Sequence, residues 1–250
     1  MNRGPIMDRA LEPAWLDVAL QVALDAHPHA ARSVLAMRLR DRIDLRDRWD
    51  KRLTVLSRIW LNPPAVARPC VAWALERAHR VGDPRPLHIG AMLAAYPFFG
   101  DVCAAVGREL SLQGEAFVTS VRRRLRQRWG DRVEVDVATR AAIRTIRKLG
   151  LVSGSKGALR VGRGERLPVP SALAPWLVHA LLLTRCSQEI DVRQVRGSPE
   201  LFMVELPRSW SSKYPYLERF NEGGGGTVLR LRKVDVGAGD GERQTRLFNT

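Results

Sequence analysis

The chain lacks a long hydrophobic run. No stretch of its 250 residues reaches the roughly 18 apolar residues that a membrane-spanning helix needs. The best candidate, Ala174 to Leu183, is too short and contains His179. The first residues, MNRGPIMDRALEP, lack the continuous apolar segment and the small-residue cleavage site of a secretory signal. We therefore expect a cytoplasmic protein with no membrane partner.

Cysteine is also scarce. The chain has three cysteines, Cys70, Cys103 and Cys186, which are widely spaced and lie in apolar surroundings. An odd number at such spacing does not suit a disulfide framework, and it favours reduced, buried thiols. We assign no redox role to them.

Motifs for common enzyme chemistry are missing as well. The five histidines show no HExxH or His-Cys spacing, and the chain has no GxxxxGK[ST], GxGxxG or GxSxG motif. Asp41, Asp44, Asp47 and Asp50 recur every three residues among basic neighbours, which favours a surface ion-pair network over a two-metal nuclease site. We therefore expect a non-catalytic protein with no cofactor and no metal site.

Acidic residues are few in relation to basic ones. The chain has 41 Lys and Arg against 26 Asp and Glu, a net charge of +15, and this excess predicts a polyanionic partner, either nucleic acid or an anionic membrane surface. The charge is concentrated in one place. From Arg122 to Arg166 there are 14 basic residues and four acids, a net charge of +10. This local cluster of positive charge is a better guide to a binding surface than the net charge of the whole chain.

A hydrophobic content of 45% is typical of a folded protein with a substantial core. Apolar residues recur at three-and-four spacing through most of the chain, so we predict a mainly α protein. We divide it into a helical N-terminal region at 1–84, a central region at 85–166, a small α+β region at 167–234 and a flexible tail at 235–250. In the last third we predict a short helix from Cys186 to Val195 and strands at Leu201 to Leu206 and Thr227 to Val234. In the central region Asp101 is a candidate cap for a helix that begins after it.

The central region predicts helix, helix, turn, helix and hairpin in that order. Thr119 or Ser120 is a candidate cap for a helix that ends at Trp129, and Asp136 is a candidate cap for a helix from Val137 to Leu149. In this second helix Ala142, Ile143, Ile146 and Leu149 form one face, and Arg140, Arg144, Arg147 and Lys148 form another. Two extended runs joined by SGSKG follow it and suit a hairpin.

This order of elements resembles the winged-helix form of the helix-turn-helix fold. In that family the last helix enters the DNA major groove, and the hairpin, or wing, touches the adjacent backbone or minor groove. The resemblance implies that double-stranded DNA is the partner. It implies that the second helix and the wing contact DNA and that the first helix contacts the backbone phosphates. The predicted DNA-binding residues are Arg122, Arg123, Arg126, Arg128, Thr139, Arg140, Arg144, Arg147, Lys148, Lys156 and Arg160.

Two other functions remain open at this level. Winged helices also serve as protein-docking modules, so the chain is alternatively a scaffold subunit whose basic face is incidental, and RNA is an alternative polyanion. A second resemblance concerns the whole chain. Its organisation and the segment IRTIRKLGLV, from Ile143 to Val152, are similar to the BrxA-like proteins of bacterial BREX phage-defence systems. This resemblance implies an accessory or regulatory subunit of a defence assembly, with other proteins of that assembly as partners.

Overall fold

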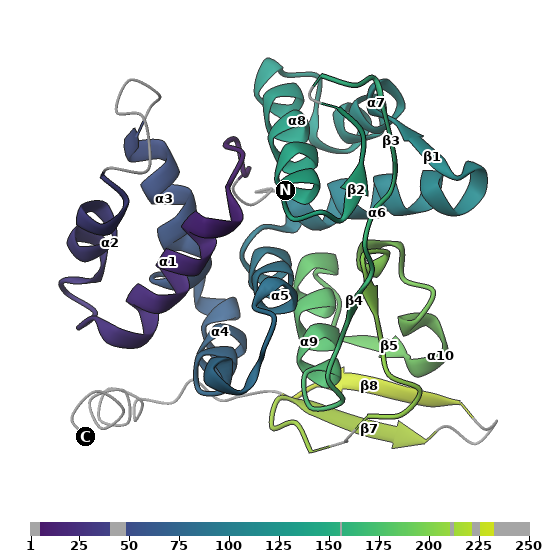
Figure 1. Ribbon diagram of the computed structural model, residues 1–250. Coiled ribbons are helices and arrows are strands. Elements are labelled where there is room, and N and C mark those ends of the chain that lie inside the picture. Colours follow the sequence, from purple (N-terminus) through teal and green to yellow (C-terminus); the bar gives the residue numbers. More distant parts are fainter. Residues whose placement is uncertain (1–5, 41–48, 156, 211–212, 222–225, 233–250) are drawn as a thin grey trace.

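The computed structural model of the chain describes residues 6–40, 49–155, 157–210, 213–221 and 226–232 (Figure 1). Within these ranges the protein is mainly helical, as predicted, and small sheets occur in its central and C-terminal parts. The predicted tail at 235–250 lies outside the described residues.

Four helices form the N-terminal part of the molecule, at the left of Figure 1. They are α1 (Pro13–Asp25), α2 (Ala31–Leu39), α3 (Trp49–Trp60) and α4 (Arg68–Leu75), and 3-10 turns at Ala65–Ala67 and Ala78–Arg80 flank α4. Helix α3 buries Leu53, Leu56 and Trp60 on one side, because these residues follow helical spacing. Asn62, Pro63 and Pro64 follow it directly and prevent its continuation.

Two helices that meet at a sharp bend pass through the middle of the molecule. Helix α5 (Arg85–Ala95) and helix α6 (Pro97–Gln113) meet at Tyr96 with a bend of 116°, because Pro97 has no N–H with which to continue α5. Helix α9 (Ala174–Arg185) packs against both. At Gly100 the approach is so close that an added Cβ would lie 2.0 Å from Thr184 Oγ1. No single described helix is both long and apolar enough to cross a membrane, and α5 and α6 meet that test only together, across their bend.

The central part follows α6 and contains a small sheet with two helices. Strand β1 (Glu115–Phe117) leads into α7 (Val118–Trp129) and α8 (Val133–Lys148), after which β2 (Val152–Ser153) and β3 (Arg160–Arg163) form an antiparallel hairpin. Strand β1 pairs antiparallel with β3, so the sheet order is β1-β3-β2. The sheet and the helices lie at the upper right of Figure 1.

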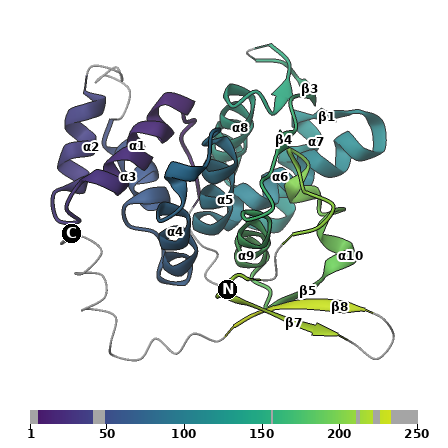
Figure 2. The same cartoon turned by 60° about the horizontal axis from the view of Figure 1, so that its bottom comes forward.

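The C-terminal part contains two further sheets, and the larger one lies at the lower edge of the molecule in Figure 2. Strands β4 (Leu167–Pro168) and β6 (Val204–Glu205) are parallel, whereas β5 (Glu189–Asp191), β8 (Thr227–Leu231) and β7 (Leu217–Asn221) form an antiparallel sheet in that order. One helical turn, α10 (Val192–Val195), follows β5, and a 3-10 turn at Pro199–Leu201 packs on α6.

A single cluster of buried side chains contains residues from the N-terminal, central and C-terminal regions, from Met7 to Leu229. The segment before α1 takes part in it, since Met7 and Leu11 are fully buried. Leu11 also donates its backbone N–H to Thr145 Oγ1 of α8 at 3.0 Å. The N-terminal segment therefore attaches α8 to the N-terminal helices.

The structure corrects several local predictions. The helix expected between Cys186 and Val195 is strand β5 with one turn of helix, and the strand expected at Leu201 to Leu206 is reduced to Val204–Glu205. Helix α6 begins at Pro97 and not after Asp101, because the extended Tyr96 and the proline already define its first turn. Cys70 and Cys103 are buried as expected, but Cys186 is exposed, because it ends α9 in the left-handed region with φ 51°.

Candidate nucleic-acid interface

Helix α8 carries a row of arginines on the side that faces away from the core. It begins at Val133, four residues before the predicted start at Val137, and Asp136 lies inside its first turn and does not cap it. Ile143 and Ile146 are buried, whereas Arg140 and Arg144 are exposed. The two predicted faces of this helix are therefore confirmed.

The exposed arginines of α8 have no carboxylate partner among the described residues. Arg140 donates weakly, through Nε, to the backbone oxygen of Asp136 at 3.4 Å. Arg147 donates through Nη1 to the backbone oxygen of Ser155 in the hairpin loop at 2.6 Å, so it connects α8 to the hairpin. For Arg144 the described part of the chain supplies neither a hydrogen bond nor an ion pair. We call the row Arg140, Arg144 and Arg147 the α8 stripe.

Thr139 does not belong to this surface. Its side chain is fully buried, and its hydroxyl donates to the backbone oxygen of Val135 at 2.7 Å. The prediction that Thr139 faces DNA is therefore wrong. The reason is helical geometry, because Thr139 lies one turn from Ile143 on the buried side and Arg140 is rotated away from it by about 100°.

Two predicted phosphate contacts on α7 are engaged in an internal ion pair. Arg122 and Arg126 both bind the carboxylate of Asp136 on α8, and Arg126 Nε lies 2.9 Å from Asp136 Oδ1. Asp136 is only 5% exposed. The hydrogen bonds from Arg122 and Arg126 hold the pKa of the Asp136 carboxyl well below its usual range. This pair connects α7 to the first turn of α8.

Arg128 is paired as well. Its Nε lies 2.7 Å from Asp101 Oδ2 of α6, and the indole of Trp129 donates to the same oxygen at 2.7 Å. Trp129 is 5% exposed and packs edge-on against Phe98, so it belongs to the core. Burial raises the pKa of the Asp101 carboxyl above its usual value, although Trp129 and Arg128 oppose this effect.

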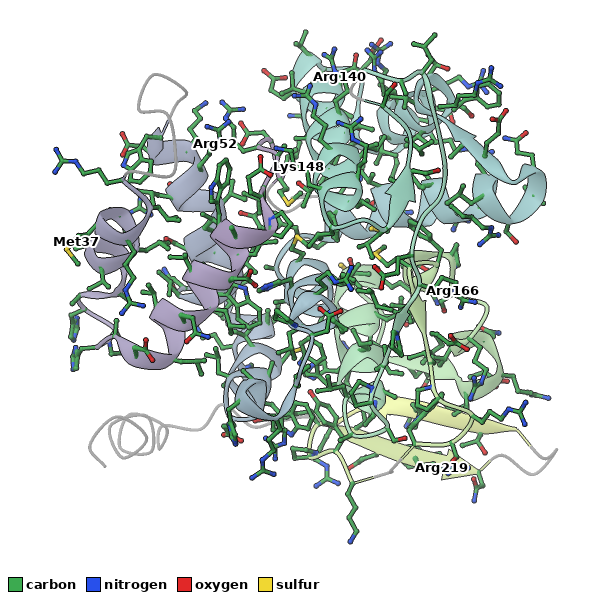
Figure 3. The ribbon with its side chains drawn as sticks, viewed as in Figure 1. Met37, Arg52, Arg140, Lys148, Arg166 and Arg219 are labelled. Atoms are coloured by element: carbon green, nitrogen blue, oxygen red, sulfur yellow. The ribbon has the colours of Figure 1, made fainter. Side chains whose placement is uncertain are left out.

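The remaining predicted residues differ in their surroundings. Lys148 forms an ion pair with Glu12, just before α1, and Arg160 of β3 forms one with Glu115 of β1 at 3.1 Å. Figure 3 shows Lys148 at the end of α8 nearest the N-terminal helices and Arg140 toward the other end. Arg123 has no partner among the described residues, and Lys156 lies outside them.

The structure therefore separates the predicted basic residues into two groups. Five of them have a carboxylate partner: Arg122, Arg126, Arg128, Lys148 and Arg160. Four described residues have none, namely Arg123, Arg140, Arg144 and Arg147. Part of the charge in the central stretch is thus neutralised within the protein, and three of the four predicted basic residues without a carboxylate partner lie on α8.

Sequence reasoning missed Arg85, which joins three parts of the chain. Its guanidinium binds both oxygens of Asp83, both oxygens of Glu165 and the backbone oxygen of Leu149. It thereby holds the end of α8 against the segment that follows the hairpin. The signal in the sequence was weak, because 80 residues separate Arg85 from Glu165.

Comparison with protein-family models, with curated proteins and with solved structures gave no match to this chain. Within the described residues, no group of three or more His, Cys, Asp or Glu is arranged to hold a metal ion.

Proposed function

We propose that residues 97–163 form a winged helix-turn-helix and that the protein binds double-stranded DNA through it without catalysing a reaction. The order of α6, α7, α8 and the β2–β3 hairpin supports this proposal, and β1 adds a strand to the hairpin. In this arrangement α8 is the recognition helix and the hairpin is the wing.

The observation that carries the proposal is the α8 stripe. Its arginines project from a helix of 16 residues, about 24 Å long, which the major groove is wide enough to admit. Each guanidinium can bind phosphate oxygens or the O6 and N7 atoms of guanine in a bidentate way. Because no carboxylate among the described residues neutralises Arg140 or Arg144, their charge is available to an anionic ligand.

Arg147 and Arg160 both make contacts within the protein, so they are only partly available to DNA. Arg147 holds the loop of the wing through Ser155, and Arg160 is shared with Glu115 and stacks on Phe117 with its guanidinium carbon 5.9 Å from the ring centroid. We propose that they place the wing beside α8 and contribute less to binding than Arg140 and Arg144. Most contacts are then to phosphates, which predicts modest sequence preference.

The test is a fluorescence-anisotropy titration of a random-sequence duplex at several salt concentrations. The double variant Arg140→Glu with Arg144→Glu is the informative one, since Arg147 also supports the wing. We expect wild-type binding to weaken steeply with salt, and we expect the variant to bind at least about tenfold more weakly, with a salt slope reduced by about two.

The matched control is Arg68→Glu with Arg219→Glu. Both residues are exposed, and the control changes the net charge by the same amount. Figure 3 shows Arg219 at the opposite end of the molecule from Arg140. Equal loss in both double variants would mean that only net charge matters, and it would overturn the assignment to α8.

Two other outcomes separate the remaining functions. If single-stranded or double-stranded RNA competes with the DNA duplex and binds more tightly, the proposed ligand is RNA and not DNA. Absence of binding at low salt would favour a protein-docking role, for which Phe117 and Leu159 are exposed apolar candidates beside the wing. The accessory role in a defence assembly is a proposal that depends on the sequence resemblance alone.

A further inference from the structure

A depression of about 510 Å³ lies along α7 and the turn that follows it. Five of the residues that line it belong to α7, and the sixth, Asp131, belongs to the turn after it. None of the described lining residues comes from α8. The lining residues are Thr119, Arg122, Arg123, Arg126, Gln127 and Asp131.

The arginines of this depression are arranged as an anion site. Asp136, which does not line the depression, binds Arg122 and Arg126, so both guanidinium groups are oriented before any ligand arrives. The Nε group of Arg122 is buried and has no hydrogen-bond partner, and Arg123 is exposed without a partner among the described residues. Thr119 and Gln127 add neutral donors. Several donors with fixed orientation and positive charge match the oxygens of a phosphate group.

Asp131 is the one acid in the lining. It lies 3.3 Å from Arg126 Nε, and its side chain is 81% exposed. An exposed ion pair of this kind contributes little to stability, so a phosphate competes with it at small cost. The carboxylate therefore weakens the site without closing it, which makes it a useful position for a gain-of-binding variant.

We propose that the α7 depression binds a phosphate group, and that Asp136 is the positioning residue for its two inner arginines. This inference deepens the proposed function, because the first helix is already predicted to contact backbone phosphates. It can be tested apart from that function, since binding of a free phosphate does not require that α8 bind DNA. The phosphate is either one from the backbone of the same duplex or one carried by a free phosphorylated small molecule. Both sources present the same chemistry to the site.

The experiment follows the arginine Nε–Hε resonances of the full chain during a titration with inorganic pyrophosphate. We expect the resonances of Arg122, Arg123 and Arg126 to shift together, and we expect that of Arg219 to stay in place. Arg123→Gln should weaken pyrophosphate binding about tenfold, because it removes one charge-assisted hydrogen-bonding group. Asp131→Asn should strengthen binding, and Arg219→Gln, at an exposed arginine at the opposite end of the molecule from Arg140, is the matched control that leaves it unchanged.

A second arm uses the duplex to identify the source of the phosphate. If Arg123→Gln also lowers the salt slope for the duplex by about one, the site takes a backbone phosphate. If the duplex slope is unchanged while pyrophosphate binding is lost, the site serves a free phosphorylated molecule. Pyrophosphate binding without any duplex binding would retain this site and overturn the proposed function.

Two results would overturn the site itself. One is a pyrophosphate titration in which all exposed arginines shift alike, which indicates non-specific screening. The other is equal binding by wild type, Arg123→Gln and Asp131→Asn.

Discussion

Arg126 of α7 donates its Nε hydrogen to Oδ1 of Asp136 in the first turn of α8, over a distance of 2.9 Å. Arg122, one turn earlier, binds the other oxygen of the same carboxylate. One buried acid therefore binds two arginines of the basic stretch, neutralises one of their two charges, and fixes the two helices relative to each other. The same residues that suggest a DNA contact in the sequence thus also perform a structural task.

Replacing this acid should destabilise the protein. We expect Asp136→Asn to lower the free energy of unfolding by about 2 to 3 kcal/mol at pH 7, somewhat below the usual cost of breaking a buried pair because both arginines are partly exposed. The pKa of the Asp136 carboxyl is lower in the folded than in the unfolded state, so its contribution is full above about pH 4 and declines as the pH falls further.

Urea unfolding followed by circular dichroism at pH 7 and pH 3 measures this effect. The difference between wild type and Asp136→Asn should be smaller at pH 3. The exposed Asp131→Asn is the control and should change stability by less than about 0.5 kcal/mol. An unchanged stability of Asp136→Asn at pH 7 would contradict the structural role of the pair.

His179 should make the stability depend on pH near neutrality. It is 5% exposed, its Nδ1 lies 2.7 Å from the Tyr214 hydroxyl, and burial lowers its pKa to about 4. Because the unfolded chain binds a proton near pH 6.5 and the folded chain does not, stability is full above about pH 6.5 and is lost as the pH falls toward 4. The loss attributable to this histidine is about 3 kcal/mol.

The check compares wild type with His179→Gln by urea unfolding at several values between pH 7 and pH 4. The variant should show a shallower decline, because glutamine does not titrate. His29→Gln, at an exposed histidine, should retain the wild-type slope. Equal slopes for wild type and His179→Gln would show that the histidine does not cause the decline.

Gly107 should not tolerate a side chain. A Cβ at this position in α6 would lie 2.1 Å from the backbone oxygen of Pro199, which cannot move aside as a flexible side chain would. Alanine usually stabilises a helix relative to glycine by up to about 1 kcal/mol, but here we expect a net loss of about 1 to 3 kcal/mol.

The urea midpoint of Gly107→Ala measures this cost, and Gly82→Ala is its control, since nothing lies within 4 Å of a Cβ at Gly82. The control should remain within about 0.5 kcal/mol of wild type. A stabilised Gly107→Ala would mean that α6 and the 3-10 turn at Pro199–Leu201 pack less closely than described.

Much of the helical architecture follows from local sequence. The buried face of α8 and its arginine row follow from three-and-four spacing, and the ends of α3 and of α7 follow from Asn62-Pro63-Pro64 and from Gly130. The C-terminal part was predicted less well. Its strands are short and pair with segments far away in sequence, as β5 does with β8, and such pairing leaves little periodic signal.

In the candidate site, too, some features follow from local sequence and others depend on contacts between distant segments. Local sequence determined that the chain is basic, that the charge gathers between Arg122 and Arg166, and that α8 presents arginines on one side, because composition and helical period act over a few residues. Only the tertiary structure decided which of these arginines keep their charge for a ligand. An ion pair such as that of Lys148 with Glu12, 136 residues apart, exists only because folding brings the two segments together, and a one-dimensional pattern carries no information about that distance.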